Sequence, residues 1–178
     1  MSREGFTIYV DGSCLGNQNV DETTPSGWGV VVVTGDSGLG KGSGEIFHEE
    51  NGRVITDSEN VEFIGAEVGS NNTAELTAFA MALRWILVNV EGEKVLIRSD
   101  STYAGNLADG SWKAKANKEL VATLRSLWDE VYSVFDLSWQ HVRAHRGHRW
   151  NERADHLASR AAGDETPLPV EFWKPGQK

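Results

Sequence analysis

The chain has 178 residues, of which 39% are hydrophobic and 24% charged, and this composition is typical of one globular domain rather than of a disordered or fibrous protein. Its formal net charge of −9 argues against a generally basic nucleic-acid-binding protein. No apolar run approaches the ~20 residues that span a bilayer, and the single cysteine, Cys14, excludes an internal disulfide and favours a reducing compartment.

The first part of the chain predicts three strands. Residues 6–13 are rich in β-branched and aromatic residues, and this run reaches Asp11 just before a loop rich in glycine, serine and asparagine. Residues 27–35 are dominated by valine, which predicts a strand at the centre of a sheet. After a glycine-rich turn, residues 45–69 predict either an extended hairpin around Asn51-Gly52 or a strand with an insertion.

Helices and strands alternate in the remainder of the chain. Apolar residues spaced i, i+3, i+4 and i+7 from Leu76 to Val90 predict a helix, and Asn72 followed by Glu75 resembles a capping box at its start. The other predicted elements are a strand over 94–99, a short helix after Asp100, a helix over 118–131, a strand over 136–142 and a helix over 151–162.

This order of elements predicts the fold. Opening strands joined by short turns pair antiparallel, whereas strands separated by helices pair in parallel through right-handed crossovers. The simplest architecture is an α/β fold with a mixed sheet and helices on both faces. We expect one domain over residues 1–163 and a proline-containing tail, 164–178, that either docks through Val170, Phe172 and Trp173 or stays loose.

Four acidic residues are candidates for a common site, although each has a simpler explanation. Asp100 fits a helix N-cap, Glu75 fits the partner in a capping box, and Asp155 fits a carboxylate that the helix dipole favours near a helix start. Asp11 and Asp100, however, both follow strands, and the carboxyl ends of parallel strands meet at one edge of a sheet. Glu75 and Asp155 would pack over that edge from their helices.

Four converging carboxylates would repel one another and raise each other's pKa unless cations neutralised them. Ligands that are all oxygen suit Mg²⁺ or Mn²⁺ rather than zinc. Two such ions activate a water and stabilise the leaving oxygen in phosphodiester cleavage. The four acids therefore predict a site for two Mg²⁺ ions, for which Mn²⁺ would substitute.

Two basic islands interrupt this acidic chain. Residues 112–125 carry four basic residues and one acid, and residues 141–153 carry four arginines and one acid. Each island has a net charge of +3, so the rest of the chain carries −15. Solvated faces are the simplest explanation of such charge runs.

Five segments resemble the ribonuclease H type 1 family. They are YVDGSCLGN (9–17), GWG (27–29), SNNTAEL (70–76), RSDSTY (98–103) and VRAHRGHRWNERADHLA (142–158). They occur in the family's order, and the resemblance runs from about residue 6 to residue 163. It implies a five-stranded mixed sheet, with three antiparallel N-terminal strands and two further parallel strands, flanked by helices. It also implies endonucleolytic cleavage of the RNA strand of RNA·DNA hybrids, leaving a 3′-hydroxyl and a 5′-phosphate.

The resemblance also implies the catalytic residues. The positions that match the family's four metal-binding acids are Asp11, Glu75, Asp100 and Asp155. His145 matches the mobile histidine in the loop before the last helix, thought to assist proton transfer or product release. This role agrees with its glycine-punctuated loop and with the titration of histidine near neutral pH.

Further matches concern the substrate. Asn17, Asn71 and Asn72 occupy family positions that contact the hybrid in its minor groove, where amides suit ribose 2′-hydroxyls and base edges. The alternative is that these asparagines form turns and cap helices. Ser70 stands where the family has a small hydroxyl residue near a DNA phosphate, and Thr102 stands where it often has a glutamine that reaches the minor groove.

The chain differs from many bacterial members, whose basic, Trp-rich protrusion is reduced here to GNLADGSWKAKANKELV. Trp112 would stack on a sugar in the DNA-strand channel, with Lys113, Lys115 and Lys118 on phosphates. Simple packing is the alternative for Trp112. The few residues before the first strand leave no room for an N-terminal hybrid-binding module, so we expect modest affinity and low processivity.

Other functions remain open. Exonucleases and DNA-joining recombinases share the fold but lack the three asparagines and the histidine-containing loop described above. A non-catalytic hybrid-binding domain and a domain excised from a reverse transcriptase polyprotein are further alternatives. We expect a monomeric, cytoplasmic enzyme whose partner is the hybrid, with no membrane and no obligate protein partner.

Overall fold

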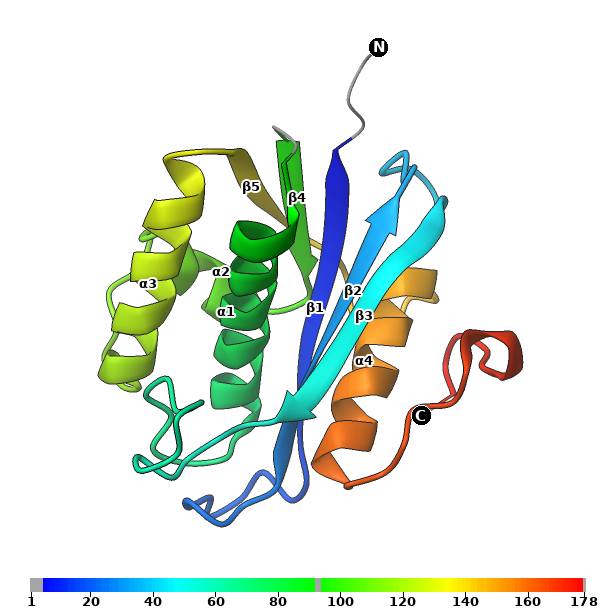
Figure 1. Cartoon of the computed structure of the whole chain (residues 1–178). Helices are drawn as coiled ribbons and strands as arrows, with labels where there is room; N and C mark the ends of the chain where they lie inside the picture. The colour runs from blue at the N-terminus through cyan, green and yellow to red at the C-terminus, as the bar shows by residue number, and fades with distance from the viewer. Residues whose placement is uncertain (1–4, 92–93, 178) are drawn as a thin grey trace.

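The computed structural model describes residues 5–91 and 94–177. Its centre is a five-stranded sheet with the strand order β3-β2-β1-β4-β5 (Figure 1). The first three strands pair antiparallel, while β4 and β5 continue the sheet in parallel with β1. The strands are β1 (Phe6–Cys14), β2 (Ser26–Thr34), β3 (Glu45–Arg53), β4 (Lys94–Ser99) and β5 (Asp136–His141). The predicted mixed sheet is confirmed.

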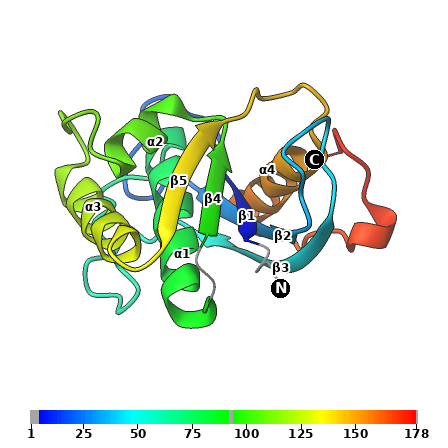
Figure 2. The same cartoon turned by 90° about the horizontal axis from the view of Figure 1, so that it is seen from above.

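Helices cover both faces of the sheet, as predicted. The helices are α1 (Asn71–Asn89), α2 (Thr102–Ala108), α3 (Lys118–Tyr132) and α4 (Arg149–Ala162). Figure 2 shows α1, α2 and α3 on one side of the strands and α4 on the other. A short 3₁₀ turn, Val170–Phe172, follows in the tail.

Alternation along β1 divides the apolar residues between two cores, because successive side chains of a strand point to opposite faces. Ile8 and Val10 join the larger core with α1 and α3. Tyr9 joins a smaller core with Val31 of β2 and Trp150 of α4. All three of these β1 side chains are fully buried, so the strand that leads to Asp11 is held from both sides.

The structure decides two details of the predicted strands. The valine-rich strand β2 is internal, but β1 is the middle strand of the five. Of the two alternatives for residues 45–69, the strand with an insertion is confirmed and the hairpin is wrong, because Asn51 and Gly52 lie within β3 and pair with Gly29 and Trp28. The chain from residue 54 to residue 70 is a connection without a further strand.

The helix starts also differ from the sequence expectations. Ser70 caps α1 and forms a capping box with Thr73, so Asn72 is not the cap and Glu75 is not the partner in the box. Ser101 rather than Asp100 caps α2. Asp155 is the seventh residue of α4, beyond the first turn in which the helix dipole acts. The simpler explanations of the three acids therefore fail.

The tail docks on the body of the protein. The Trp173 side chain is buried, and the Arg153 guanidinium lies 5.2 Å from its ring centre. The Leu168 amide donates to His156 Nε2 at 3.0 Å. Phe172, by contrast, is exposed. Among the described residues, no helix combines the length and the apolar character needed to cross a membrane.

Candidate active site

The parallel register of β1 and β4 brings two acids to the same end of the sheet. Val10 pairs with Ser99, so the next residues of the two strands, Asp11 and Asp100, stand next to each other. Asp11 is buried and Asp100 is half-buried. The Gly12 amide donates to Asp11 Oδ1 at 2.9 Å, which holds that carboxylate at the strand.

Glu75 reaches the pair because α1 packs closely on β1 at Gly12. A Cβ atom at Gly12 would lie 2.4 Å from the Glu75 amide nitrogen and 2.5 Å from the Ala74 carbonyl carbon. Only a residue without a side chain allows this approach. The glycine of the DGS segment therefore positions Glu75 beside Asp11.

A second close approach brings Asp155 to the site. Gly29 of β2 pairs with Asp11, and a Cβ atom at Gly29 would lie 2.5 Å from the carbonyl oxygen of Ala154. The GWG segment thus lets α4 lie against the sheet at the level of Asp11, and Asp155 is the next residue of that helix. Sequence and register together explain the convergence of the four acids.

Three of the four acids form a compact group. One carboxylate oxygen from each of Asp11, Glu75 and Asp100 lies within 4.8 Å of the others. Asp155 is outside this group, but its charge raises the pKa of all three. The predicted cluster is therefore a close triad with a fourth carboxylate nearby.

Burial and mutual repulsion perturb the triad. Burial, followed by the charges of Glu75 and Asp100, raises the pKa of Asp11 well above its usual range. Burial and the charge of Asp100 raise the pKa of Glu75 to about 8. Burial also raises the pKa of Asp100. The other groups of the described protein do not offset burial and repulsion, because all three pKa values stay raised.

The residues of the triad fit a divalent cation. All donor atoms are oxygens, which suit hard cations. Glu75 Oε2 is buried and has no hydrogen-bond partner in the described protein, so this oxygen is available to a metal ion. A cation there would remove the repulsion that raises the three pKa values.

One residue of the site was missed in the sequence. Asn151 of α4 is buried and donates a hydrogen bond to Asp100, which favours the charged carboxylate and lowers its pKa against the effect of burial. Its Oδ1 atom has no partner in the described chain. The asparagine of the NExAD segment was the available signal, because it lies one helical turn before Asp155.

The predicted histidine lies in the loop between β5 and α4. His145 is exposed and has a φ of +56°, the left-handed region that non-glycine residues seldom adopt. The charge of His145 lowers the pKa of Asp100, which places the imidazole within electrostatic reach of the triad.

His148 has a structural role at the start of α4. Its side chain caps α4 by accepting from the Asn151 amide, and its Nε2 atom lies 3.3 Å from the Tyr9 hydroxyl and 3.2 Å from Arg98 Nη1. Burial and the charge of Arg98 lower the pKa of His148. The Tyr9 hydroxyl in turn donates to Asp36. This network ties the histidine loop to β1 and β4.

The predicted minor-groove residues gather beside the start of α1. Asn17, Asn71 and Asn72 are exposed, and Asn17 Oδ1 accepts a hydrogen bond from the Asn71 amide at 3.2 Å. Ser70 is half-buried because its hydroxyl caps the helix. Exposed amides thus lie within one helical turn of Glu75.

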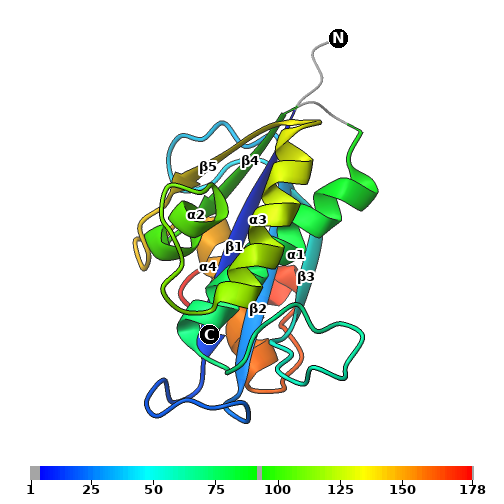
Figure 3. The same cartoon turned by 90° about the vertical axis from the view of Figure 1, so that its left-hand side faces the viewer.

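The reduced protrusion lies between α2 and α3 (Figure 3). The Trp112 side chain is 49% exposed, so core packing does not explain it. Trp112, Lys113, Lys115 and Asn72 line one pocket, which joins the first basic island to the start of α1. Thr102 is the first residue of α2 and is exposed.

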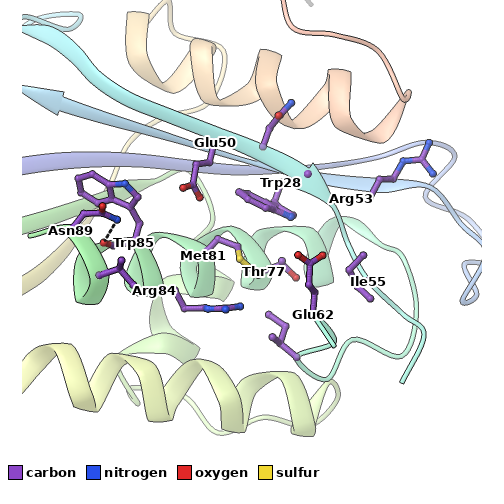
Figure 4. Close-up of a pocket in the computed structure, with 14 residues that line it drawn as sticks. Trp28, Glu50, Arg53, Ile55, Glu62, Thr77, Met81, Arg84, Trp85 and Asn89 are labelled. Atoms are coloured by element: carbon purple, nitrogen blue, oxygen red, sulfur yellow. Dashed lines mark hydrogen bonds between the residues drawn. The ribbon is translucent and has the colours of Figure 1, made fainter. Parts of the chain in front are cut away.

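A second pocket lies between β3, α1 and the chain that follows β3. Figure 4 shows Trp28, Met81 and Trp85 along it, with the carboxylates of Glu50 and Glu62 at its rim. None of the predicted site residues lines this pocket. Its apolar walls come from three separate elements, so no local sequence pattern predicts this pocket.

Comparison with known proteins agrees with the geometry. A family model described as RNase H matches residues 3–163. Ribonuclease H of Anaplasma marginale (strain St. Maries) is 32% identical over 169 residues, which cover 89% of this chain and 90% of that protein. Ribonuclease H of Cupriavidus metallidurans is 32% identical over 160 residues, which cover 86% of this chain and 92% of that protein.

Solved structures share the fold. RNase H1 from the halophilic archaeon Halobacterium salinarum NRC-1 has a TM-score of 0.63 at 25% identity, covering 90% of this chain and 98% of that one. LC11-RNase H1, solved in complex with an RNA/DNA hybrid, has a TM-score of 0.63 at 24% identity, covering 89% of this chain and 97% of that one.

Proposed function

The chain belongs to the RNase H family, and we propose that it cleaves the RNA strand of RNA·DNA hybrids internally, leaving 3′-hydroxyl and 5′-phosphate ends. The observation that carries this proposal is the triad of carboxylate oxygens within 4.8 Å at the end of β1 and β4. A structurally similar protein has been solved with an RNA/DNA hybrid bound, which supports the choice of substrate.

In this proposal the four acids hold divalent cations. Asp11, Glu75 and Asp100 provide the closest oxygens, and Asp155 adds a carboxylate beside them. Two Mg²⁺ ions are the expected metals, and Mn²⁺ substitutes, because small hard cations prefer oxygen ligands. When bound, such ions supply an activated water and stabilise the leaving oxygen of the phosphodiester. Asn151 keeps Asp100 oriented through its hydrogen bond.

His145 moves a proton at the leaving oxygen or assists product release. Its loop position leaves the imidazole exposed, and its charge lowers the pKa of Asp100. An imidazole changes protonation near neutral pH, which suits both tasks. His148, at the end of the same loop, caps α4.

Substrate recognition divides between two areas. Asn17, Asn71 and Asn72 read the minor groove, where the 2′-hydroxyl separates RNA from DNA. The second area takes the DNA strand on the pocket that contains Trp112, through Lys113 and Lys115. Ser70 adds a hydroxyl near a DNA phosphate, and Thr102 belongs with the minor-groove positions. Stacking on tryptophan and lysine contacts to phosphates are both independent of sequence.

The proposal also covers the oligomeric state, the domain bounds and the location of the enzyme. One chain supplies all four carboxylates and both recognition areas, which supports a monomer acting without an obligate protein partner. The catalytic domain covers residues 1–163, with the docked tail as an accessory. The single cysteine supports a cytoplasmic location.

A substrate panel tests this function. The end-labelled RNA strand would be offered to the purified chain with Mg²⁺ as an RNA·DNA hybrid, as an RNA duplex and as a single strand, beside a DNA duplex. We expect internal cuts in the RNA of the hybrid alone, with 3′-hydroxyl ends that a polymerase extends. Equal cutting of single-stranded RNA, or release of single nucleotides from an end, would contradict the proposal.

A further inference from the structure

Four exposed cations surround the loop between β5 and α4, residues 142–148. They are Lys41, Arg143, Arg146 and Arg149. The loop itself contains no acid. The fourth arginine of the second basic island behaves differently, because Arg153 is buried and donates to Glu49 at 2.9 Å. Neither catalysis nor the two recognition areas described above use the exposed four.

The structure holds these cations together from two loops. The Arg149 amide donates to the Lys41 carbonyl at 2.8 Å, which fixes the β2–β3 loop to the start of α4. A Cβ atom at Gly147 would lie 3.6 Å from Lys41 Nζ, so the ammonium group lies beside the histidine loop. The Arg149 guanidinium lies over the Trp150 ring at 4.6 Å.

Apart from the stacking of Arg149 on Trp150, the guanidinium groups of this surface have no partner in the described protein. Other arginines are engaged: Arg98 donates to the Tyr9 hydroxyl, and Arg53 donates to the Ala161 carbonyl. Within residues 5–91 and 94–177, no hydrogen bond or ion pair engages the guanidinium of Arg143, Arg146 or Arg149. Unpaired cations gathered in one place on a chain of net charge −9 are suited to bind an anion.

This surface also stands next to the reaction centre. The Val142 amide donates to the Ser99 carbonyl at 2.9 Å, so the loop leaves the sheet beside Asp100. Figure 2 shows α2 on one side of the end of β4 and the loop toward α4 on the other. Trp112 and the lysines that line its pocket come directly after α2 in the chain. The two basic areas therefore flank the carboxylates.

We propose that Lys41, Arg143, Arg146 and Arg149 form a second phosphate-binding surface, which holds the sugar–phosphate backbone of the bound hybrid on the side of the carboxylates away from Trp112. The inference rests on the proposed function, because its ligand is the same hybrid. It explains how an acidic protein with four acids at its centre attracts a polyanion to that centre. Local cations offset the repulsion that the rest of the chain exerts on phosphates.

Direct binding tests the surface. Fluorescence anisotropy would follow a labelled hybrid, in chelator and over a series of salt concentrations, with wild type, Arg146→Ala, Arg149→Ala and the double variant. Each lost phosphate contact lowers the slope of log K against log salt by about 0.9. We expect the double variant to lose about two units of slope and to bind about tenfold more weakly at moderate salt.

Three control variants separate charge from packing. Arg146→Lys and Arg149→Lys keep the charge and should keep most of the binding. Arg84→Ala removes an exposed arginine of α1 that lies on the second pocket, and it should bind like wild type. A loss that lysine does not restore, or an equal loss in Arg84→Ala, would overturn the inference.

Cleavage by the same preparations keeps the two proposals distinguishable. With Mg²⁺ the double variant should show a raised KM and a kcat close to that of wild type. If wild type cleaves the hybrid while the double variant has unchanged KM, affinity and slope, only the phosphate-binding surface is wrong. If wild type does not cleave the hybrid, the proposed function is wrong.

Discussion

Among single residues, Glu75 carries the clearest electrostatic cost. Its pKa in the folded protein is about 8, against an ordinary value of 4.5. Between these two pH values the folded chain keeps a proton that the unfolded chain has released. Stability therefore falls as pH rises through this interval when no cation is bound, by up to about 1.4 kcal/mol per pH unit for one proton.

Replacing Glu75 with glutamine should remove this cost. In chelator at pH 8, Glu75→Gln should melt at a higher temperature than wild type, and below pH 4.5 the two should differ little. Thermal melts from pH 4 to pH 8 measure the difference, with the exposed Glu67→Gln as the matched control. A Glu75→Gln protein that is less stable than wild type at pH 8 in chelator would show that repulsion does not dominate at this position.

His145 offers a second test at the residue scale. His145→Ala should lower kcat by about tenfold to a hundredfold and change hybrid affinity by less than about twofold, because a proton-transfer group acts in the reaction and not in binding. Single-turnover and multiple-turnover rates on one hybrid separate chemistry from product release. An equal loss of affinity and of rate would assign His145 to binding. His141→Ala, an exposed histidine at the end of β5, is the control.

The residue types and order of the four acids were predictable, whereas some of their partners were not. Asn151 and Asp100 are 51 positions apart, so no local pattern reveals their hydrogen bond. The helix cap was misassigned for a related reason. Ser70 and Asn72 are both good capping residues, and in the structure Ser70 starts the helix in a capping box with Thr73.

Between elements, glycines set the distances that the site needs. Gly12→Ala would place a methyl group against the backbone of Ala74 and Glu75, and α1 would have to move from β1. We expect a loss of about 1–3 kcal/mol in stability and at least a tenfold loss in cleavage. Gly163→Ala is the control, because its methyl would come closest to the end of the exposed Glu165 side chain, at 3.1 Å, and would make an ordinary contact with the Ser159 carbonyl oxygen at 3.5 Å. Unchanged cleavage by Gly12→Ala would show that the helix tolerates displacement.

The strands and helices themselves follow from local patterns with few exceptions. The alternation and valine content of β1 and β2 and the apolar spacing of α1 each identify an element within a few residues. The hairpin alternative at β3 fails for a physical reason. Asn51-Gly52 is a strong turn signal, but here Gly52 accommodates the Trp28 ring, since a Cβ would lie 2.9 Å from it.

For the whole molecule, the uneven charge distribution predicts how binding depends on salt. Replacing Lys113, Lys115 and Lys118 together with alanine should raise KM, leave kcat unchanged and flatten the salt dependence by about two to three units of slope. This result would show that the lysines of the first basic island contact phosphates. A KM equal to that of wild type at every salt concentration would make this island a solvated face. Lys174→Ala, at an exposed position of the docked tail, is the control.

The most direct test of the account joins the carboxylates to the chemistry. An end-labelled RNA·DNA hybrid would be incubated with wild type and with Asp100→Asn, each in Mg²⁺ and in chelator, after circular dichroism and thermal melts establish that both are folded. We expect internal cuts in the RNA with wild type and Mg²⁺ only, and at least a hundredfold less with the folded variant. Cleavage in chelator, or by folded Asp100→Asn at the rate of wild type, would contradict a metal site at the end of β1 and β4.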